Sequence, residues 1–150
     1  MWNCNGGCDV SGPHVIVDTN VFIAARNRRE PGFVSSRKLL DGIDRGEFHA
    51  VVSTVTIAEI RAGLSVEEVP TVWRAILTHL LTSPNYHVAS VDSDIAEAAG
   101  ALRASSRLTL PDAMIVATGR LRGAAFLVTQ DPTLARTQSE LAIKAPEDVV

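Results

Sequence analysis

The sequence predicts an α/β fold, a three-layer α/β/α sandwich around a central parallel sheet of four to five strands. Short apolar segments rich in β-branched residues alternate with longer segments whose apolar residues recur at helical spacing. Strands that are separated by helices pair in parallel and are covered on both faces. A chain of 150 residues is also large enough to form one domain that buries roughly two thirds of its unfolded surface without a disulfide or structural metal.

The individual elements follow from local signals. We predict strands at residues 14–17, 50–53, 86–91 and 125–129, and a weak strand at residues 142–145. We predict helices at residues 21–25, 35–46, 55–63, 67–81, 110–122 and 132–140, and one that begins after a cap at Asp92, Ser93 or Asp94. Asn20 is expected to cap the first helix, and Gly46 and Gly123 are expected to end two later ones.

The first twelve residues differ from the rest of the chain. Residues 1–12 are polar and glycine-rich and lack the basic start, apolar run and cleavage site of a secretory signal. We interpret them as a disordered leader or a remnant of cloning, before a domain at residues 13–150. Cys4 and Cys8 both fall in this leader, and a folded part without cysteine fits a reducing cytoplasm. With His14, these two thiols make a poor zinc site. The chain has no apolar run near the roughly 18 residues of a membrane span.

The charged residues are unevenly chosen. A formal net charge of −3 argues against a surface that coats nucleic acid generally, yet the chain has twelve arginines and only two lysines. Codon choice in a GC-rich genome accounts for much of this bias. Arginine is also the side chain that binds phosphate with two parallel hydrogen bonds. Arg26, Arg28 and Arg29, which follow the first strand closely, are therefore candidates for binding a phosphate backbone.

Four acidic residues are candidates for one functional site. Asp18 ends the first predicted strand, and Asp131 follows the fourth in the string VTQD. Because the carboxyl ends of parallel strands meet at one edge of the sheet, where ligands bind in open α/β folds, these two carboxylates are placed to meet. Glu59 lies in the helix after the second strand, and Asp112 lies in the first turn of the helix before the fourth.

Each acid has a structural interpretation when it is taken alone. Asp131 before a proline is a common turn and cap signal, Asp112 at a helix start is favoured by the helix dipole, and Glu59 would face water. However, the residues flanking Glu59 and Asp112 are apolar, so we expect these carboxylates to be largely buried and to need a compensating charge. Since lysine is scarce, a divalent cation that prefers oxygen ligands, Mg²⁺ or Mn²⁺, is the expected partner.

The four motifs together resemble the PIN-domain family, and most closely its VapC-type toxins. They are DTN at residues 18–20, TIAEIRAG around Glu59, LPDAMIVATG around Asp112 and LVTQD ending at Asp131. They occur in the family's order, and the resemblance spans about residues 15–145. At Gln130 the family tolerates variation.

The resemblance implies a metal-dependent ribonuclease, a hydrolase that cleaves phosphodiester bonds in structured RNA such as tRNA or rRNA. Its catalytic and metal-binding residues would be Asp18, Glu59, Asp112 and Asp131, with one or two Mg²⁺ ions. Asn20 and Thr129 would support them by hydrogen bonds. The resemblance further implies a cytoplasmic homodimer that acts as the toxin of a toxin–antitoxin pair and is blocked by a small VapB-type antitoxin.

Other functional classes share part of this pattern of motifs. A PIN-domain nuclease that processes RNA and a non-catalytic PIN-like binding module both share these motifs, and the small size of the chain favours the toxin. A haloacid-dehalogenase-type phosphatase would need an aspartate where this chain has Asn20, and a response-regulator receiver would need a paired acid and a late lysine. Neither pattern is present.

The remaining polar candidates are given structural roles. Asp92 and Asp94 are interpreted as helix caps rather than metal ligands, and Trp73 as a core residue rather than part of a partner-binding face. The histidines are interpreted as structural because they lie away from the acids in the predicted elements. They are His14, His49, His79 and His87.

Overall fold

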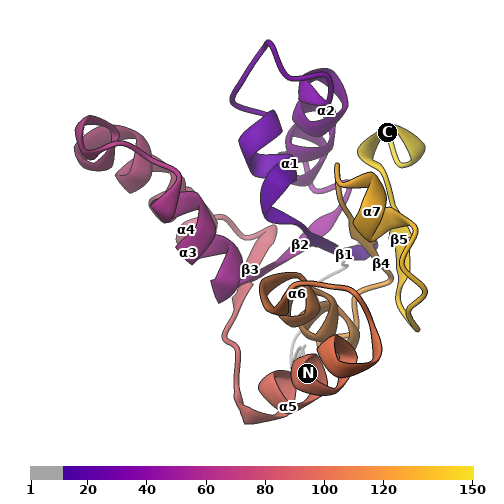
Figure 1. Ribbon diagram of the computed structural model, residues 1–150. Coiled ribbons are helices and arrows are strands. Elements are labelled where there is room, and N and C mark those ends of the chain that lie inside the picture. The colour runs from indigo at the N-terminus through magenta and orange to yellow at the C-terminus, as the bar shows by residue number, and fades with distance from the viewer. Residues whose placement is uncertain (1–11) are drawn as a thin grey trace, which may run out of the picture.

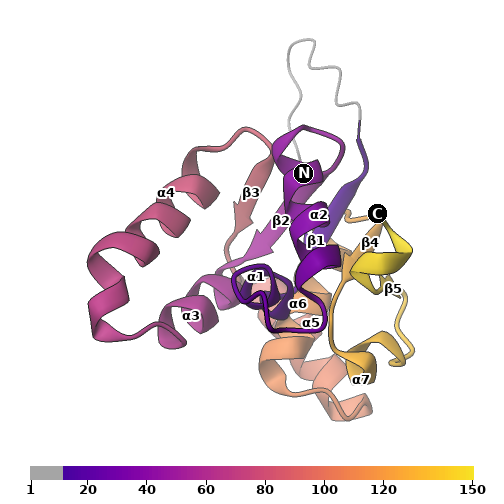
Figure 2. The ribbon, with the colours of Figure 1, turned by 90° about the horizontal axis from the view of Figure 1, so that it is seen from above.

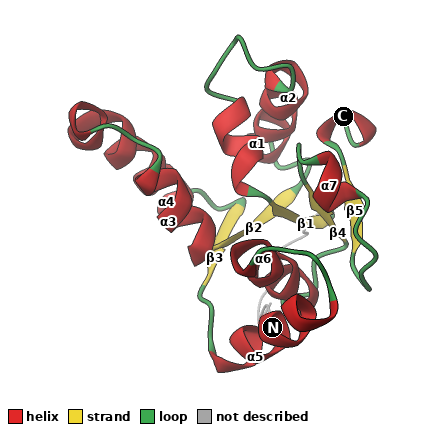
Figure 3. Cartoon of the chain, viewed as in Figure 1, coloured by secondary structure: helices red, strands yellow, loops and turns green. Residues whose placement is uncertain are grey.

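The computed structural model describes residues 12–150, which form a parallel sheet between two layers of helices (Figures 1 and 3). The strands are β1 (His14–Val17), β2 (His49–Ser53), β3 (Tyr86–Ala89), β4 (Phe126–Val128) and β5 (Ala142–Lys144). Their order in the sheet is β3-β2-β1-β4-β5, and every neighbouring pair is parallel. The predicted α/β/α sandwich is confirmed, including the weak fifth strand. The predictions for residues 1–11, with Cys4 and Cys8, lie outside the described residues.

The helices cover the two faces of the sheet. The first face carries α1 (Thr19–Ala24), α2 (Phe33–Asp44), α3 (Thr54–Ala62) and α4 (Arg74–Thr82). The second carries α5 (Ser93–Ser105), α6 (Leu110–Leu121) and the short α7 (Pro132–Ala135). Figures 1 and 2 show α3 and α4 on the β3 side of the sheet and α7 on the β5 side. Among the described helices, none is long and apolar enough to cross a membrane.

The core is divided by the sheet into two apolar clusters. Successive side chains of a strand point to opposite faces, so β1 contributes Val15 and Val17 to one cluster and Ile16 to the other. All three are fully buried. A strand that is buried on both faces has a nearly continuous run of apolar, β-branched residues in its sequence, and for this reason HVIV could be recognised as a strand. β1 is the central strand of the sheet, with β2 and β4 as its neighbours.

The predicted helix at residues 67–81 is interrupted in the structure. The chain first forms a short 3₁₀ turn (Val66–Glu68), then a π-helical segment (Val69–Trp73), and only then α4. Pro70 lies in this stretch and has no backbone N–H to donate, so a regular α-helix cannot run through it. Trp73 is partly buried and packs against the first core cluster, as predicted.

Two other helix predictions need correction. The helix predicted at residues 132–140 ends at Ala135, and Leu134 is its one buried residue. A single apolar anchor does not stabilise a longer amphipathic helix. The first helix begins at Thr19 and is capped by Asp18 rather than by Asn20. The chain therefore passes directly from β1 into α1. A further 3₁₀ turn, Pro146–Asp148, was not predicted.

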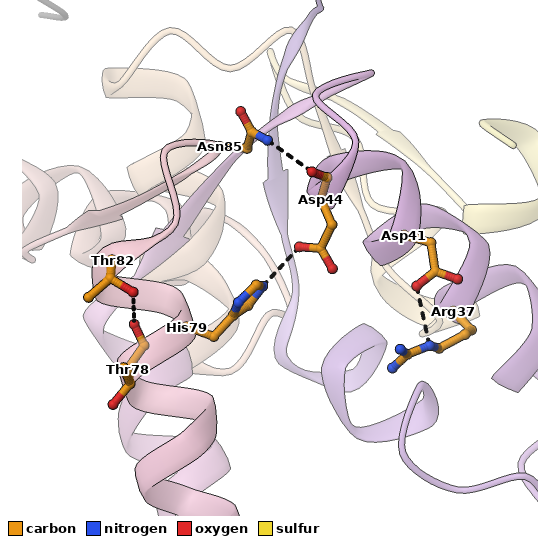
Figure 4. A network of polar contacts seen from close by, with 7 residues as sticks. All are labelled: Arg37, Asp41, Asp44, Thr78, His79, Thr82 and Asn85. Carbon is orange, nitrogen blue, oxygen red and sulfur yellow. Dashed lines mark hydrogen bonds and ion pairs between the residues drawn. The ribbon is translucent and has the colours of Figure 1, made fainter.

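Polar contacts hold α4 against the end of α2 (Figure 4). His79 Nε2 lies 2.8 Å from Asp44 Oδ1, and Asn85 Nδ2 donates to the Asp44 backbone carbonyl at 3.3 Å. Within α2, Arg37 and Asp41 form an ion pair one turn apart at 3.4 Å. His79 therefore has the structural role expected of it.

Candidate active site

Asp18 lies at the carboxyl end of the central strand, where β1 passes into α1. Its backbone N–H still donates to the Val128 carbonyl of β4 at 3.0 Å, so the residue is held at the sheet edge. Oδ1 accepts from the Thr19 N–H at 2.7 Å, and Oδ2 accepts from the Thr129 hydroxyl at 2.8 Å. Only 4% of the residue is exposed. Asp18 is thus a rigidly held, buried carboxylate.

The environment of Asp18 disfavours its charge. Burial raises the pKa of Asp18 from 3.8 to about 6, the hydrogen bonds from Thr129 and Thr19 oppose this shift, and the charges of Asp112 and Glu59 add to it. In residues 12–150, no lysine or arginine pairs with Asp18, Asp112 or Glu59. A cluster of acids without a basic partner is the electrostatic arrangement that a bound cation would relieve.

Glu59 is tied to the same edge through Thr19. The Thr19 hydroxyl donates to Glu59 Oε2 and also lies 3.2 Å from the Thr56 hydroxyl. Thr19 is itself buried, so it links the first turn of α1 to α3 from inside the protein. Glu59 is only partly buried, and the expectation that it is largely buried is wrong in degree. Its neighbour Ala58 is exposed, because this side of α3 faces away from the core.

Asp112 is brought to the edge by the start of α6. Thr109 caps this helix, accepting from the Asp112 N–H at 3.3 Å, and Pro111 occupies the first turn as predicted. Asp112 is partly exposed, so it too is less buried than expected. Because its charge acts on Asp18, the two carboxylates share one site.

Asp131 is placed differently from the other three acids. Its Oδ1 accepts from the Thr133 N–H at 2.8 Å and caps α7, so the structural interpretation of this residue is correct. Its N–H donates to the Thr129 hydroxyl at 2.9 Å, which in turn contacts Asp18. Asp131 is not among the charges that raise the pKa of Asp18. Glu59 and Asp112 therefore both act on Asp18, and Asp131 adjoins Asp18 through Thr129.

The supporting hydrogen bonds expected of Asn20 and Thr129 are present. Asn20 Nδ2 lies 3.2 Å from the Thr129 hydroxyl, and Asn20 Oδ1 accepts from the Gln130 N–H at 2.9 Å. Sequence reasoning missed two participants, Thr19 and Gln130. The position of Thr19 between Asp18 and Asn20 was a usable signal, since the first residue of a helix at a sheet edge is readily buried. Gln130 has no local signal.

The remaining candidates lie elsewhere. Asp92 caps α5, accepting from the Ile95 N–H at 2.9 Å, and pairs with Arg122 at 2.6 Å, which confirms its structural interpretation. His14 and His49 begin β1 and β2, at the opposite edge of the sheet from Asp18, and their rings stack with centroids 5.3 Å apart.

The donor chemistry of the acidic edge fits a hard divalent cation. The groups that meet there are carboxylate, hydroxyl and amide oxygens, which Mg²⁺ and Mn²⁺ prefer. In the side-chain positions of residues 12–150, however, no three His, Cys, Asp or Glu side chains form a ready-made metal-binding group. Glu59 and Asp112, which are only partly buried, would have to reorient toward Asp18 to complete one.

Comparisons with known proteins place this fold in a family. The family model described as PIN domain matches residues 15–140. A comparison with curated protein sequences gives no match. Among solved structures, VapBC2 from Rickettsia felis, bound to a DNA fragment from its promoter, has a TM-score of 0.66 at 16% identity and covers 88% of this chain and 98% of its own.

Two further structures are similar at the same level. A toxin–antitoxin complex from Klebsiella pneumoniae has a TM-score of 0.64 at 22% identity, with coverage of 88% of this chain and 97% of its own. The sarcin-ricin loop cleaving toxin VapC20 of Mycobacterium tuberculosis has a TM-score of 0.61 at 17% identity, with coverage of 81% and 92%. At these identities the likeness shows a shared fold. Because the family model matches most of the chain, the protein belongs to the PIN-domain family.

Proposed function

We propose that this protein is a Mg²⁺-dependent endoribonuclease that hydrolyses phosphodiester bonds in structured RNA, tRNA or rRNA, as the toxin of a toxin–antitoxin pair. The observation that carries the proposal is the buried Asp18 at the carboxyl edge of the sheet, acted on by Asp112 and Glu59 and lacking a basic partner in the described chain. Membership of the PIN family and the toxins among the similar structures support it.

The roles of the residues follow from their positions. Asp18, Glu59 and Asp112 would hold the cation, and Asp131 would join them with its second oxygen, Oδ2, which has no hydrogen-bond partner among residues 12–150. Bound Mg²⁺ supplies a Lewis acid that polarises the phosphodiester and acidifies the attacking water. The hydroxyls of Thr19 and Thr129 hold Glu59 and Asp18 at the sheet edge by hydrogen bonds, and Glu59 and Asp112 would turn toward Asp18 when the cation binds.

The proposed partners follow from the similar structures. Several of them are complexes of a toxin with its antitoxin. We propose that this chain forms a homodimer, binds a VapB-type antitoxin that blocks the acidic edge, and acts in the cytoplasm. Co-expression with an antitoxin should relieve growth inhibition by the wild type, and Asp18→Asn should be harmless without it.

A cleavage assay tests the nuclease directly. Purified protein is incubated with tRNA and with a labelled sarcin-ricin-type RNA hairpin, in Mg²⁺ or Mn²⁺ and then in EDTA. The wild type and Glu97→Gln, which neutralises an exposed carboxylate of α5, should cleave. EDTA and Asp18→Asn should each reduce the rate at least about 100-fold, since a lost ligand should cost no less than a lost supporting contact. Cleavage that survives the chelator or Asp18→Asn would contradict the proposal.

A further inference from the structure

Gln130 joins the acidic edge to a second segment of the chain. Its backbone N–H donates to Asn20 Oδ1 at 2.9 Å, within the network that supports Asp18. Its side-chain Nε2 lies 2.7 Å from Ser36 Oγ, 3.0 Å from the Gly32 carbonyl and 3.3 Å from Ser35 Oγ. These three acceptors belong to the start of α2, which Gly32 caps without a side chain of its own. The amide of Gln130 thus binds the start of α2 from a distant part of the chain, as a hydrogen-bond donor.

The Gln130 amide packs closely against Gly32 and Ser36. At Gly32 φ is −86°, so the backbone itself would accept a side chain. An added Cβ would nevertheless overlap the amide group of Gln130. A side chain at position 32 would therefore displace the Gln130 amide from its acceptors, and Ser36, which receives the shortest of the three contacts, is fully buried.

Gly32 also ends the segment that carries the arginines near the site. We call residues 26–31 the arginine loop; it connects α1, which Asp18 caps, to the start of α2. Arg26 pairs with Glu68 at 3.1 Å. Arg28 and Arg29 are exposed, and neither guanidinium makes an ion pair or hydrogen bond within the described chain. Two guanidinium groups are thus available to an external anion, and phosphate is the anion whose geometry they match.

We infer that Gln130 is a positioning residue for RNA: it holds the arginine loop beside the acidic edge, so that Arg28 and Arg29 bind phosphates of the strand being cut. The inference rests on the proposed nuclease function. The six residues of α1 rise by about 9 Å, so the loop begins only this far along the helix axis from Asp18. Gln130 itself does not touch the reacting atoms.

Enzyme kinetics separate this role from a purely structural one. Cleavage of the labelled hairpin is measured for Gln130→Ala, for Gln130→Glu, for Arg28→Ala/Arg29→Ala and for the triple variant. Gln130→Glu keeps the shape but cannot donate to the Gly32 carbonyl, and it serves if Gln130→Ala folds poorly. The double arginine variant should raise KM about tenfold and keep kcat within about twofold of the wild-type value. The reason is that the two arginines would bind the substrate and the transition state equally well. Either Gln130 variant should raise KM to the same extent with kcat nearly unchanged. The triple variant, which combines Gln130→Ala with Arg28→Ala and Arg29→Ala, should show no further rise in KM.

The salt dependence of RNA binding gives a second readout. Binding of the same hairpin is measured in an Asp18→Asn background, which is not expected to cleave. Loss of two phosphate contacts should flatten the slope of log Kd against log salt by about 1.4 in either the arginine or the Gln130 variants. Arg45→Ala is the control, because Arg45 precedes β2 at the far edge of the sheet and, within residues 12–150, forms its ion pair with Glu47 alone, at 2.7 Å. It should leave KM and slope unchanged.

The outcomes separate the two proposals. If the wild type neither binds nor cleaves the RNA, the proposed function fails and the inference falls with it. If the wild type cleaves and the Gln130 variants keep its KM and salt slope, the inference alone is overturned. Additive effects in the triple variant would also overturn it, because Gln130 would then act independently of the arginine loop.

Discussion

Replacing Asp18 by asparagine should stabilise the metal-free protein. Asp18 is a buried carboxylate whose charge is opposed by burial and by Asp112 and Glu59. Its pKa is about 6 in the folded protein and near 3.8 when the chain is unfolded. Between these values the folded state binds more protons than the unfolded state, so the free energy of unfolding falls as the pH rises through this window. Asparagine removes the charge and with it the pH dependence.

The size of the effect follows from the shift and from the lost contact. A shift of about two pKa units is worth about 3 kcal/mol once the pH exceeds 6. Asp18 accepts one hydrogen bond on each oxygen, from Thr19 and Thr129. An amide has only one acceptor oxygen, so the variant loses one of the two, at a cost of about 1 kcal/mol. The net gain at pH 7.5 should be about 2 kcal/mol, and it should disappear by about pH 4.

Urea unfolding in EDTA at pH 4 and pH 7.5, monitored by tryptophan fluorescence and circular dichroism, measures this difference. Glu97→Gln serves as the control, because Glu97 is exposed and its neutralisation should change stability little. If the proposed function holds, addition of Mg²⁺ should stabilise the wild type but not Asp18→Asn, since an ion that binds only the folded wild-type site favours the folded state. If Asp18→Asn is no more stable than the wild type at pH 7.5 without metal, the electrostatic account of this site is wrong.

Two further substitutions test the packing and the capping that position the acids. Gly119→Ala should lose about 1 to 2 kcal/mol of stability, because its Cβ would lie 2.5 Å from Ile16 Cγ2 and 2.8 Å from Leu141 Cδ2. Gly100→Ala in α5 has nothing within 4 Å and should instead gain about 1 kcal/mol; equal melting temperatures for the two variants would contradict this reasoning. Thr109→Ala should cost about 1 kcal/mol by uncapping α6, whereas Thr109→Ser should keep the cap; an equal loss in both, measured by urea unfolding, would show that the hydroxyl does not cap.

The arrangement of strands and helices was predictable because its signals are local and strong. β1 and β2 are short β-branched runs, and Gly46 and Gly123, with φ of 81° and 74°, end helices where only glycine fits easily. The region around Pro70 was misjudged because its apolar spacing continues although the backbone hydrogen bonds cannot. Apolar spacing reports which side chains face the core, and it does not report which N–H groups are available.

The position of Asp18 at the sheet edge was predictable, but the contacts around it were not. Asp18 could be placed from its position after a strand, because the carboxyl ends of parallel strands share an edge. The burial of Glu59 and Asp112 could not be read from their neighbours, because flanking apolar residues on a helix point in other directions. The bond from Gln130 to Gly32 joins residues 98 positions apart and depends entirely on how two loops pack.

The pairing of β1 with β4 sets the order in which the protein can become active during its synthesis. Asp18 is made early, but the hydroxyl that holds its Oδ2 belongs to Thr129, 111 residues later. β1 cannot gain its second neighbour, and Asp18 cannot gain this bond, until β4 has left the ribosome. A nascent chain therefore carries an incomplete acidic edge, which is completed only when almost the whole chain has been made.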